Sequence, residues 1–108
     1  MSAKPETIFR KRIYASLAAL PNTVIFPIQQ KAIRGTPDFI LCVNSMFVAL
    51  ELKSDNGHLS ALQRHNHDMV WEKGRGIFLV AKPSNWQETY EMLLEIANAN
   101  IDTLFKQR

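Results

Sequence analysis

The stretch that decides the fold is residues 37–53, which read PDFILCVNSMFVALELK. Two apolar runs, 39–43 and 46–50, flank the polar pair Asn44-Ser45. Apolar runs of this length, bounded by turn residues, are typical of β-strands. Asparagine tolerates the positive φ angle that a two-residue hairpin turn requires. The stretch therefore predicts an antiparallel β-hairpin with Asn44 and Ser45 at its tip.

The open end of this hairpin brings charged residues together. Asp38 precedes the first strand and Glu51 lies near the end of the second, so the two carboxylates are expected to meet in space. Glu51 and Lys53 are two residues apart, and strand side chains alternate with a period of two, so both are expected on one face. The sequence thus predicts a cluster of Asp38, Glu51 and Lys53. A surface ion-pair cluster is the alternative interpretation.

Length and composition indicate one small globular domain. The chain has 108 residues, of which 46% are hydrophobic and 21% charged. Its single cysteine, Cys42, excludes an internal disulfide and is expected to be a buried core residue. The sequence shows neither a signal peptide nor an apolar run long enough to span a bilayer. We therefore expect an intracellular, cytoplasmic protein without a membrane partner.

Positive charge is concentrated in the first half of the chain. Residues 1–54 carry seven basic and three acidic side chains, whereas residues 55–108 carry six basic and seven acidic ones. Two of the three acids in the basic half are Asp38 and Glu51. This pattern suits a polyanionic ligand, although a basic surface alone does not say which one.

Helical and strand patterns alternate through the rest of the chain. Phe9, Ile13, Leu17 and Leu20 recur at helical spacing, with Glu6 on the same inward-facing stripe and the basic triplet 10–12 mostly outward. Ser60 with Gln63, and Ser84 with Gln87, have the spacing of capping boxes that start helices. The sequence predicts helices at 5–20, from Ser60 to about Lys73 and from Ser84 through Leu104, and strands at 23–28 and 76–81. The predicted class is α/β, in the order α-β-β-β-α-β-α around a mixed sheet.

Two neighbouring carboxylates need a compensating charge. At about 4 Å and an effective dielectric of about 20, their repulsion amounts to roughly 4 kcal/mol. A proton, a lysine or a divalent metal can offset it. Mg²⁺ fits well, because it prefers oxygen ligands, commonly one or two carboxylates together with phosphate oxygens. Lys53 could then orient a water molecule or stabilise charge that develops on a phosphate. These residues therefore favour metal-dependent phosphodiester chemistry.

The frame around the cluster resembles a nuclease family. Pro37-Asp38 followed by Glu51-Leu52-Lys53 resembles the motif of the PD-(D/E)xK nuclease superfamily. The segments 34–38 (RGTPD), 49–53 (ALELK), 57–63 (GHLSALQ) and 71–74 (WEKG) resemble its VRR-NUC branch, the virus-type replication-repair nucleases. The resemblance extends from Glu6 to about Ala81. It implies a restriction-endonuclease-like core, α-β-β-β-α-β, followed here by a C-terminal helix.

The resemblance also implies roles for individual residues. Asp38 and Glu51 would bind Mg²⁺ or Mn²⁺, with the backbone carbonyl of Leu52 as a further ligand. Lys53 would position or activate water. Glu6 would help with a second metal or an outer-shell water, and Gln63 would orient the site. Capping explains Gln63 equally well, and stabilisation of the helix dipole explains Glu6.

The implied activity is hydrolysis of DNA to 5′-phosphate and 3′-hydroxyl ends. Small members of this branch resemble Holliday-junction-resolving enzymes of DNA repair and recombination and act as homodimers, which implies a bacterial or phage protein. Candidate DNA contacts are Arg10, Lys11, Lys31 and Arg34, although a solvated helix face and an ordinary polar loop explain them equally well. The alternatives are a non-catalytic DNA-binding or partner-binding module and a nuclease for flaps or DNA ends.

Overall fold

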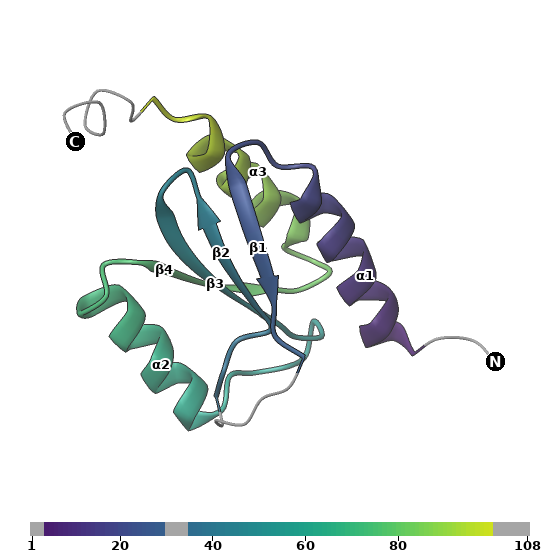
Figure 1. The fold of residues 1–108 in the computed structure, drawn as a ribbon. Coiled ribbons are helices and arrows are strands. Elements are labelled where there is room, and N and C mark those ends of the chain that lie inside the picture. Colours follow the sequence, from purple (N-terminus) through teal and green to yellow (C-terminus); the bar gives the residue numbers. More distant parts are fainter. Residues whose placement is uncertain (1–3, 30–34, 101–108) are drawn as a thin grey trace.

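In a computed structural model, which describes residues 4–29 and 35–100, the chain forms an α/β fold with a four-stranded sheet and three helices (Figure 1). The predicted class and the mixed character of the sheet are confirmed. Lys31 and Arg34 of the predicted basic loop, and Ile101 and Leu104 of the predicted last helix, lie outside the described residues. The elements are α1 (Pro5–Ala18), β1 (Thr23–Pro27), β2 (Phe39–Val43), β3 (Met46–Leu52), α2 (Ala61–Glu72), β4 (Ile77–Ala81) and α3 (Trp86–Asn98).

The predicted hairpin forms the centre of the sheet. The strand order is β1-β2-β3-β4, with antiparallel pairing from β1 through β3 and parallel pairing between β3 and β4. Asn44 and Ser45 connect β2 to β3 with φ angles of 51° and 75°. Positive φ at both central residues is the geometry of the type I′ turn, whose twist matches that of the flanking strands. The turn therefore sets the register that ends with Phe39 opposite Leu50.

The hydrophobic core lies on one face of the sheet. Phe39, Leu41 and Val43 alternate along β2 and direct their side chains to this face, and all three are fully buried. Helices α1 and α3 cover the same face (Figure 1). The fully buried partners of these β2 side chains are Ile13, Leu17, Val48, Leu50, Leu93 and Ala97. This face therefore carries most of the hydrophobic stabilisation.

The opposite face of the sheet is covered by α2, and only in part. No residue of α2 is buried, and Leu62 is 43% exposed. Cys42 is also exposed, which corrects the prediction that it is buried. The reason is strand alternation, since Cys42 faces away from the core formed by Leu41 and Val43, while α2 packs chiefly against β4. The sheet is thus buried well on one face and poorly on the other.

The two predicted capping boxes have different outcomes. At α2 the box forms as predicted: Ser60 Oγ accepts from the Gln63 N–H at 3.1 Å, and the Gln63 side chain accepts from the Ser60 N–H at 2.9 Å. At α3 the prediction is wrong, because the cap residue is Asn85. The Ser84 N–H donates instead to Asp55 Oδ1 at 2.8 Å, a contact that no local pattern announces.

Two asparagines in tight turns fasten the sheet to the end of α3. Asn44 donates through Nδ2 to the carbonyls of Ile96 (2.9 Å) and Ala99 (2.7 Å). Asn22, with a φ angle of 52°, donates to the carbonyl of Ala97 at 2.9 Å. The last carbonyls of a helix lack partners within the helix, so these side chains satisfy groups that would otherwise need water. Both residues therefore join a turn to a helix terminus.

Replacing Asn44 with glycine separates these two roles. Glycine keeps the positive φ without steric cost, so the turn survives while the hydrogen bonds to α3 are lost. We expect the Asn44→Gly variant to lose about 1–3 kcal/mol of unfolding free energy in urea titrations. Ser45→Gly is the matched control, because it changes the neighbouring turn residue and removes no contact to α3. Equal stability of the two variants would contradict this role of Asn44.

None of the helices in the described part of the chain is long and apolar enough to cross a membrane.

Candidate active site at the open end of the hairpin

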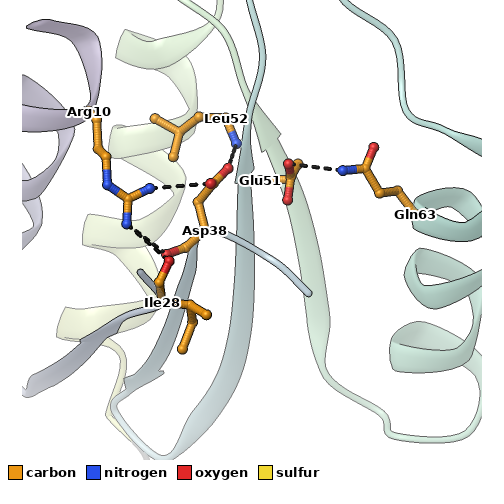
Figure 2. Close-up of polar contacts among 6 residues, drawn as sticks. All are labelled: Arg10, Ile28, Asp38, Glu51, Leu52 and Gln63. Carbon is orange, nitrogen blue, oxygen red and sulfur yellow. Dashed lines mark hydrogen bonds and ion pairs between the residues drawn. The ribbon is translucent and has the colours of Figure 1, made fainter. Parts of the chain in front are cut away.

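Glu51 is a buried carboxylate on the α2 face of the sheet. It lies in β3, between Leu50 and Leu52, whose side chains point to the core face of the sheet. Strand alternation therefore directs the Glu51 side chain to the other face, and this side chain is only 4% exposed. Gln63 Nε2, from the first turn of α2, donates to Glu51 Oε1 at 3.0 Å (Figure 2). The capping box holds the other end of the same amide, because its oxygen accepts from the Ser60 N–H. Capping and contact with Glu51 are thus two functions of one side chain.

Asp38 is the first residue beyond the hairpin ladder, next to the pair Phe39–Leu50. Its Oδ2 accepts from the Leu52 N–H at 2.7 Å, and its Oδ1 pairs with Arg10 Nη1 at 3.2 Å (Figure 2). The side chains of Arg10 and Asp38 are 32% and 16% exposed, so the pair is sheltered from water but not sealed. Asp38 therefore joins β3 to α1 and fixes the open end of the hairpin.

Arg10 contacts the open end of the hairpin, which the sequence pattern did not predict. The prediction placed it outward with Lys11, yet its Nη2 also donates to the carbonyls of Ile28 and Asp38, each at 3.4 Å. Its guanidinium lies 4.6 Å from the centre of the Phe39 ring, a cation–π geometry. Lys11 is exposed on α1, as expected of an outward position. A helical signal was available, because Arg10 lies three residues before the buried Ile13.

Lys53 and Glu6 line a common pocket on the α1 side of the hairpin end. The pocket has a volume of about 390 Å³, and Phe9, Leu52 and Pro83 supply apolar parts of its wall. Glu6 is exposed, although the helical phase predicted an inward position. The predicted site residues therefore form three groups: Glu51 with Gln63, Asp38 with Arg10, and Glu6 with Lys53. This corrects the prediction that Lys53 shares a face with Glu51, because β3 ends at Leu52 and strand alternation does not extend to Lys53. Figure 2 shows the carboxylates of Asp38 and Glu51 directed to different helices.

Leu52 connects these groups through its backbone. Its N–H donates to Asp38, whereas the N–H of the next residue, Lys53, donates to the Ala81 carbonyl of β4 at 3.0 Å. A strand residue directs its N–H and its carbonyl to the same neighbouring strand. The carbonyl of Leu52 therefore faces the same side as Asp38.

The glycine before the Pro-Asp motif is required by its surroundings. Gly35 has a φ angle of +81°, and its carbonyl accepts from Asn66 Nδ2 of α2 at 3.0 Å. A Cβ atom at this position would lie 2.7 Å from Asn66 Nδ2 and 2.9 Å from Leu62 Cγ. Only glycine combines this φ with such a close approach to α2. The segment that leads into Asp38 is thus held against α2.

The oxygen donors at the hairpin end suit a hard divalent cation. Within residues 4–29 and 35–100, no three His, Cys, Asp or Glu side chains form a metal-binding cluster. The candidate set has a different composition: carboxylates from Asp38 and Glu51, and the carbonyl of Leu52. Each carboxylate oxygen can accept more than one interaction, so the bonds from Arg10 and Gln63 leave capacity on these atoms. The donor chemistry fits Mg²⁺ or Mn²⁺, which take few protein ligands.

No protein-family model, no curated protein and no solved structure matches the chain.

Proposed function

We propose that the protein is a metal-dependent DNA endonuclease of the PD-(D/E)xK type. The observation that carries the proposal is the position of Asp38 and Glu51, the next residues after the last ladder pair on the two strands of one hairpin. Each carboxylate is held by a defined donor, Arg10 for Asp38 and Gln63 for Glu51. The basic first half of the chain suits an anionic polymer as substrate.

Each residue has a role in this proposal. Asp38, Glu51 and the Leu52 carbonyl would hold Mg²⁺ or Mn²⁺, which would supply polarisation of the phosphodiester and neutralisation of charge in the transition state. Lys53 orients the attacking water or stabilises the developing phosphate charge. Gln63 fixes the orientation of the Glu51 carboxylate. Glu6 faces the Lys53 pocket, where it can bind an outer-shell water.

The proposed substrate is branched DNA, cut by a homodimer to 5′-phosphate and 3′-hydroxyl ends. Symmetric cleavage of a junction needs two sites, and a chain of 108 residues offers one. Strand β1 lies at an edge of the sheet, and its side chains Val24 and Phe26 are 55% and 56% exposed. Exposed apolar side chains on an edge strand support contact with a second copy.

A cleavage assay tests the function directly. The purified protein is incubated with a four-way junction, a flap and a linear duplex, each end-labelled, with Mg²⁺, Mn²⁺ or EDTA. We expect paired symmetric cuts in the junction with either metal and no cleavage in EDTA, because the site depends on the cation to offset two carboxylates. Preferential cleavage of the flap or duplex ends would instead assign an end-directed or flap nuclease.

Lys53→Ala serves as the catalytic control in this assay, and Lys73→Ala as the matched variant. Lys73 is an exposed lysine at the end of α2 and belongs to none of the three groups of site residues. Lys53→Ala is expected to bind DNA and leave it intact, whereas Lys73→Ala cuts normally. If the wild-type chain binds all three DNAs and cuts none with either metal, the enzymatic proposal is refuted and a non-catalytic DNA-binding module remains.

A further inference from the structure

A second hollow lies beside Glu51, and an arginine, a lysine and a histidine line it. Its volume is about 420 Å³, and His58, Arg64 and Lys82 come from the loop before α2, from α2 itself and from the residue after β4. Val80 and Asn85 also line the hollow. None of these residues belongs to the candidate active site described above. Three separate segments thus direct basic residues to one hollow.

The hollow and the candidate active site share a face of the sheet. Val80 pairs with Glu51 in the parallel ladder between β3 and β4, and paired strand residues direct their side chains to one face. Gln63 of α2 donates to Glu51, and Arg64 is the next residue of the same helix. A polymer bound across Glu51 therefore passes the hollow on its way along the sheet.

The positive charge of the hollow is only weakly compensated. Arg64 is exposed, and in the described part of the chain its side chain has no ion pair or hydrogen bond. Lys82 Nζ donates to the backbone carbonyl of Asp55, at 3.5 Å. Hydrogen bonds from Ser84 lower the pKa of Asp55, and the positive charge of Lys82 lowers it to a smaller extent. The Asp55 carboxylate is therefore ionised at neutral pH. That carboxylate accepts from the Ser84 N–H and does not line the hollow.

Neutral groups of the hollow are already used by the fold. Asn85 Oδ1 accepts from the Lys82 N–H at 2.7 Å, and Asn85 Nδ2 donates to the Val80 carbonyl at 2.9 Å. The cationic side chains remain the groups with hydrogen-bonding capacity for a ligand. Arginine offers several donors in a planar fork that matches phosphate, and lysine adds a point charge. This chemistry suits an oxyanion such as a phosphate group.

We propose that Arg64, Lys82 and His58 bind a backbone phosphate of the DNA strand that lies across Glu51. This inference rests on the proposed function, because it takes DNA as the ligand. The site contributes affinity and register without touching the bond that is cut. It adds cationic side chains of α2 and of the residue after β4 to the basic residues in the first half of the chain.

Equilibrium binding of a labelled DNA junction in EDTA, measured over a series of salt concentrations, tests the inference. The variants are Arg64→Ala and Lys82→Ala, with Lys73→Ala as the matched control at the far end of α2. Each test variant is expected to weaken binding by roughly tenfold and to reduce the salt slope by about 1, because one phosphate contact is lost. Lys73→Ala should bind as the wild-type chain does. Arg64 is exposed on a helix, so its alanine variant keeps the fold even if the Lys82 variant does not.

The outcomes separate this inference from the proposed function. If both test variants bind with the affinity and salt slope of Lys73→Ala, the inference is refuted, whether or not the wild-type chain cleaves DNA. If the variants bind more weakly but the wild-type chain cleaves nothing with Mg²⁺ or Mn²⁺, the phosphate site stands and the nuclease proposal fails. Loss of inorganic phosphate binding in Arg64→Ala, without any change in DNA affinity, would also refute DNA as the ligand.

Discussion

The Glu51→Gln variant is expected to lose at least about 100-fold of the metal-dependent DNA cleavage rate while keeping its fold. The substitution removes the charge that the proposed metal requires and leaves the side chain almost unchanged in shape. Changes to groups that merely support a metal ligand already cost about 10–100-fold, so loss of the ligand's own charge should cost more. The rate is measured on labelled junction DNA with saturating Mg²⁺.

The fold should tolerate this change because of where Glu51 lies. The side chain is 4% exposed, and a glutamine oxygen can still accept the hydrogen bond from Gln63 Nε2. Replacing a buried charge by a neutral group of the same size is commonly neutral or stabilising. Thermal unfolding without metal should therefore show a midpoint equal to or above that of the wild-type chain. A markedly lower midpoint would mean that Glu51 serves stability through its charge.

Glu72→Gln is the matched control, since Glu72 is an exposed glutamate at the end of α2. It makes the same chemical change away from the hairpin end and should cleave at the wild-type rate. Normal cleavage by Glu51→Gln would remove Glu51 from the proposed metal site. The proposal for Asp38 would then lose its partner as well.

Local patterns were sufficient to predict the hairpin. The pair Asn44-Ser45 and its two apolar flanks determine a type I′ turn, and a two-residue turn leaves one register for the strands. The same holds for the start of α2, where Ser60 and Gln63 are three residues apart and satisfy each other. Interactions between residues that are close in sequence can be predicted from the sequence, because they do not depend on how the helices and strands pack together.

Contacts that depend on packing were not predictable in this way. The pair Arg10–Asp38 joins residues 28 positions apart, and its formation depends on how α1 crosses the end of the hairpin. The start of α3 was misplaced because Ser84 donates to the distant Asp55 and leaves the capping position to Asn85. Cys42 lies in an apolar run, but its exposure depends on the position of α2. This helix packs chiefly against β4 and leaves the face of β2 that carries Cys42 exposed.

The candidate site combines a feature that the sequence predicted with one that it did not. The spacing of Asp38 and Glu51 predicted that the two carboxylates meet at the open end of the hairpin, and the ladder places both residues at that end. It did not predict that the two carboxylates contact different helices, Asp38 through Arg10 of α1 and Glu51 through Gln63 of α2. Both helices therefore contribute to the geometry of the site, and the stability of their packing matters for it.

The Phe39→Ala variant is expected to show the largest loss of stability of any change at the hairpin. Phe39 is fully buried at the start of β2, beside Asp38, and its ring centre lies 6.2 Å from that of Tyr14 and 4.6 Å from the Arg10 guanidinium. Truncation of a buried phenylalanine costs about 3–5 kcal/mol through lost burial and the cavity that remains. This is a large part of the roughly 5–15 kcal/mol that stabilises a domain. The midpoint of thermal unfolding should fall by more than about 10 °C.

Phe39→Leu separates the packing of Phe39 from its contact with Arg10. Leucine restores much of the apolar volume and should lose only about 1–2 kcal/mol in urea titrations, but it removes the aromatic surface under the guanidinium. The conservative core change Leu93→Met is the matched control, because Leu93 is fully buried in α3 and lies outside the group formed by Asp38 and Arg10. The Arg10 Nε–H signal in ¹⁵N-labelled protein should shift and broaden in Phe39→Leu and stay unchanged in Leu93→Met. An unchanged signal in both variants would show that Asp38 alone holds Arg10, and a loss below about 1 kcal/mol in Phe39→Ala would contradict the core position of the ring.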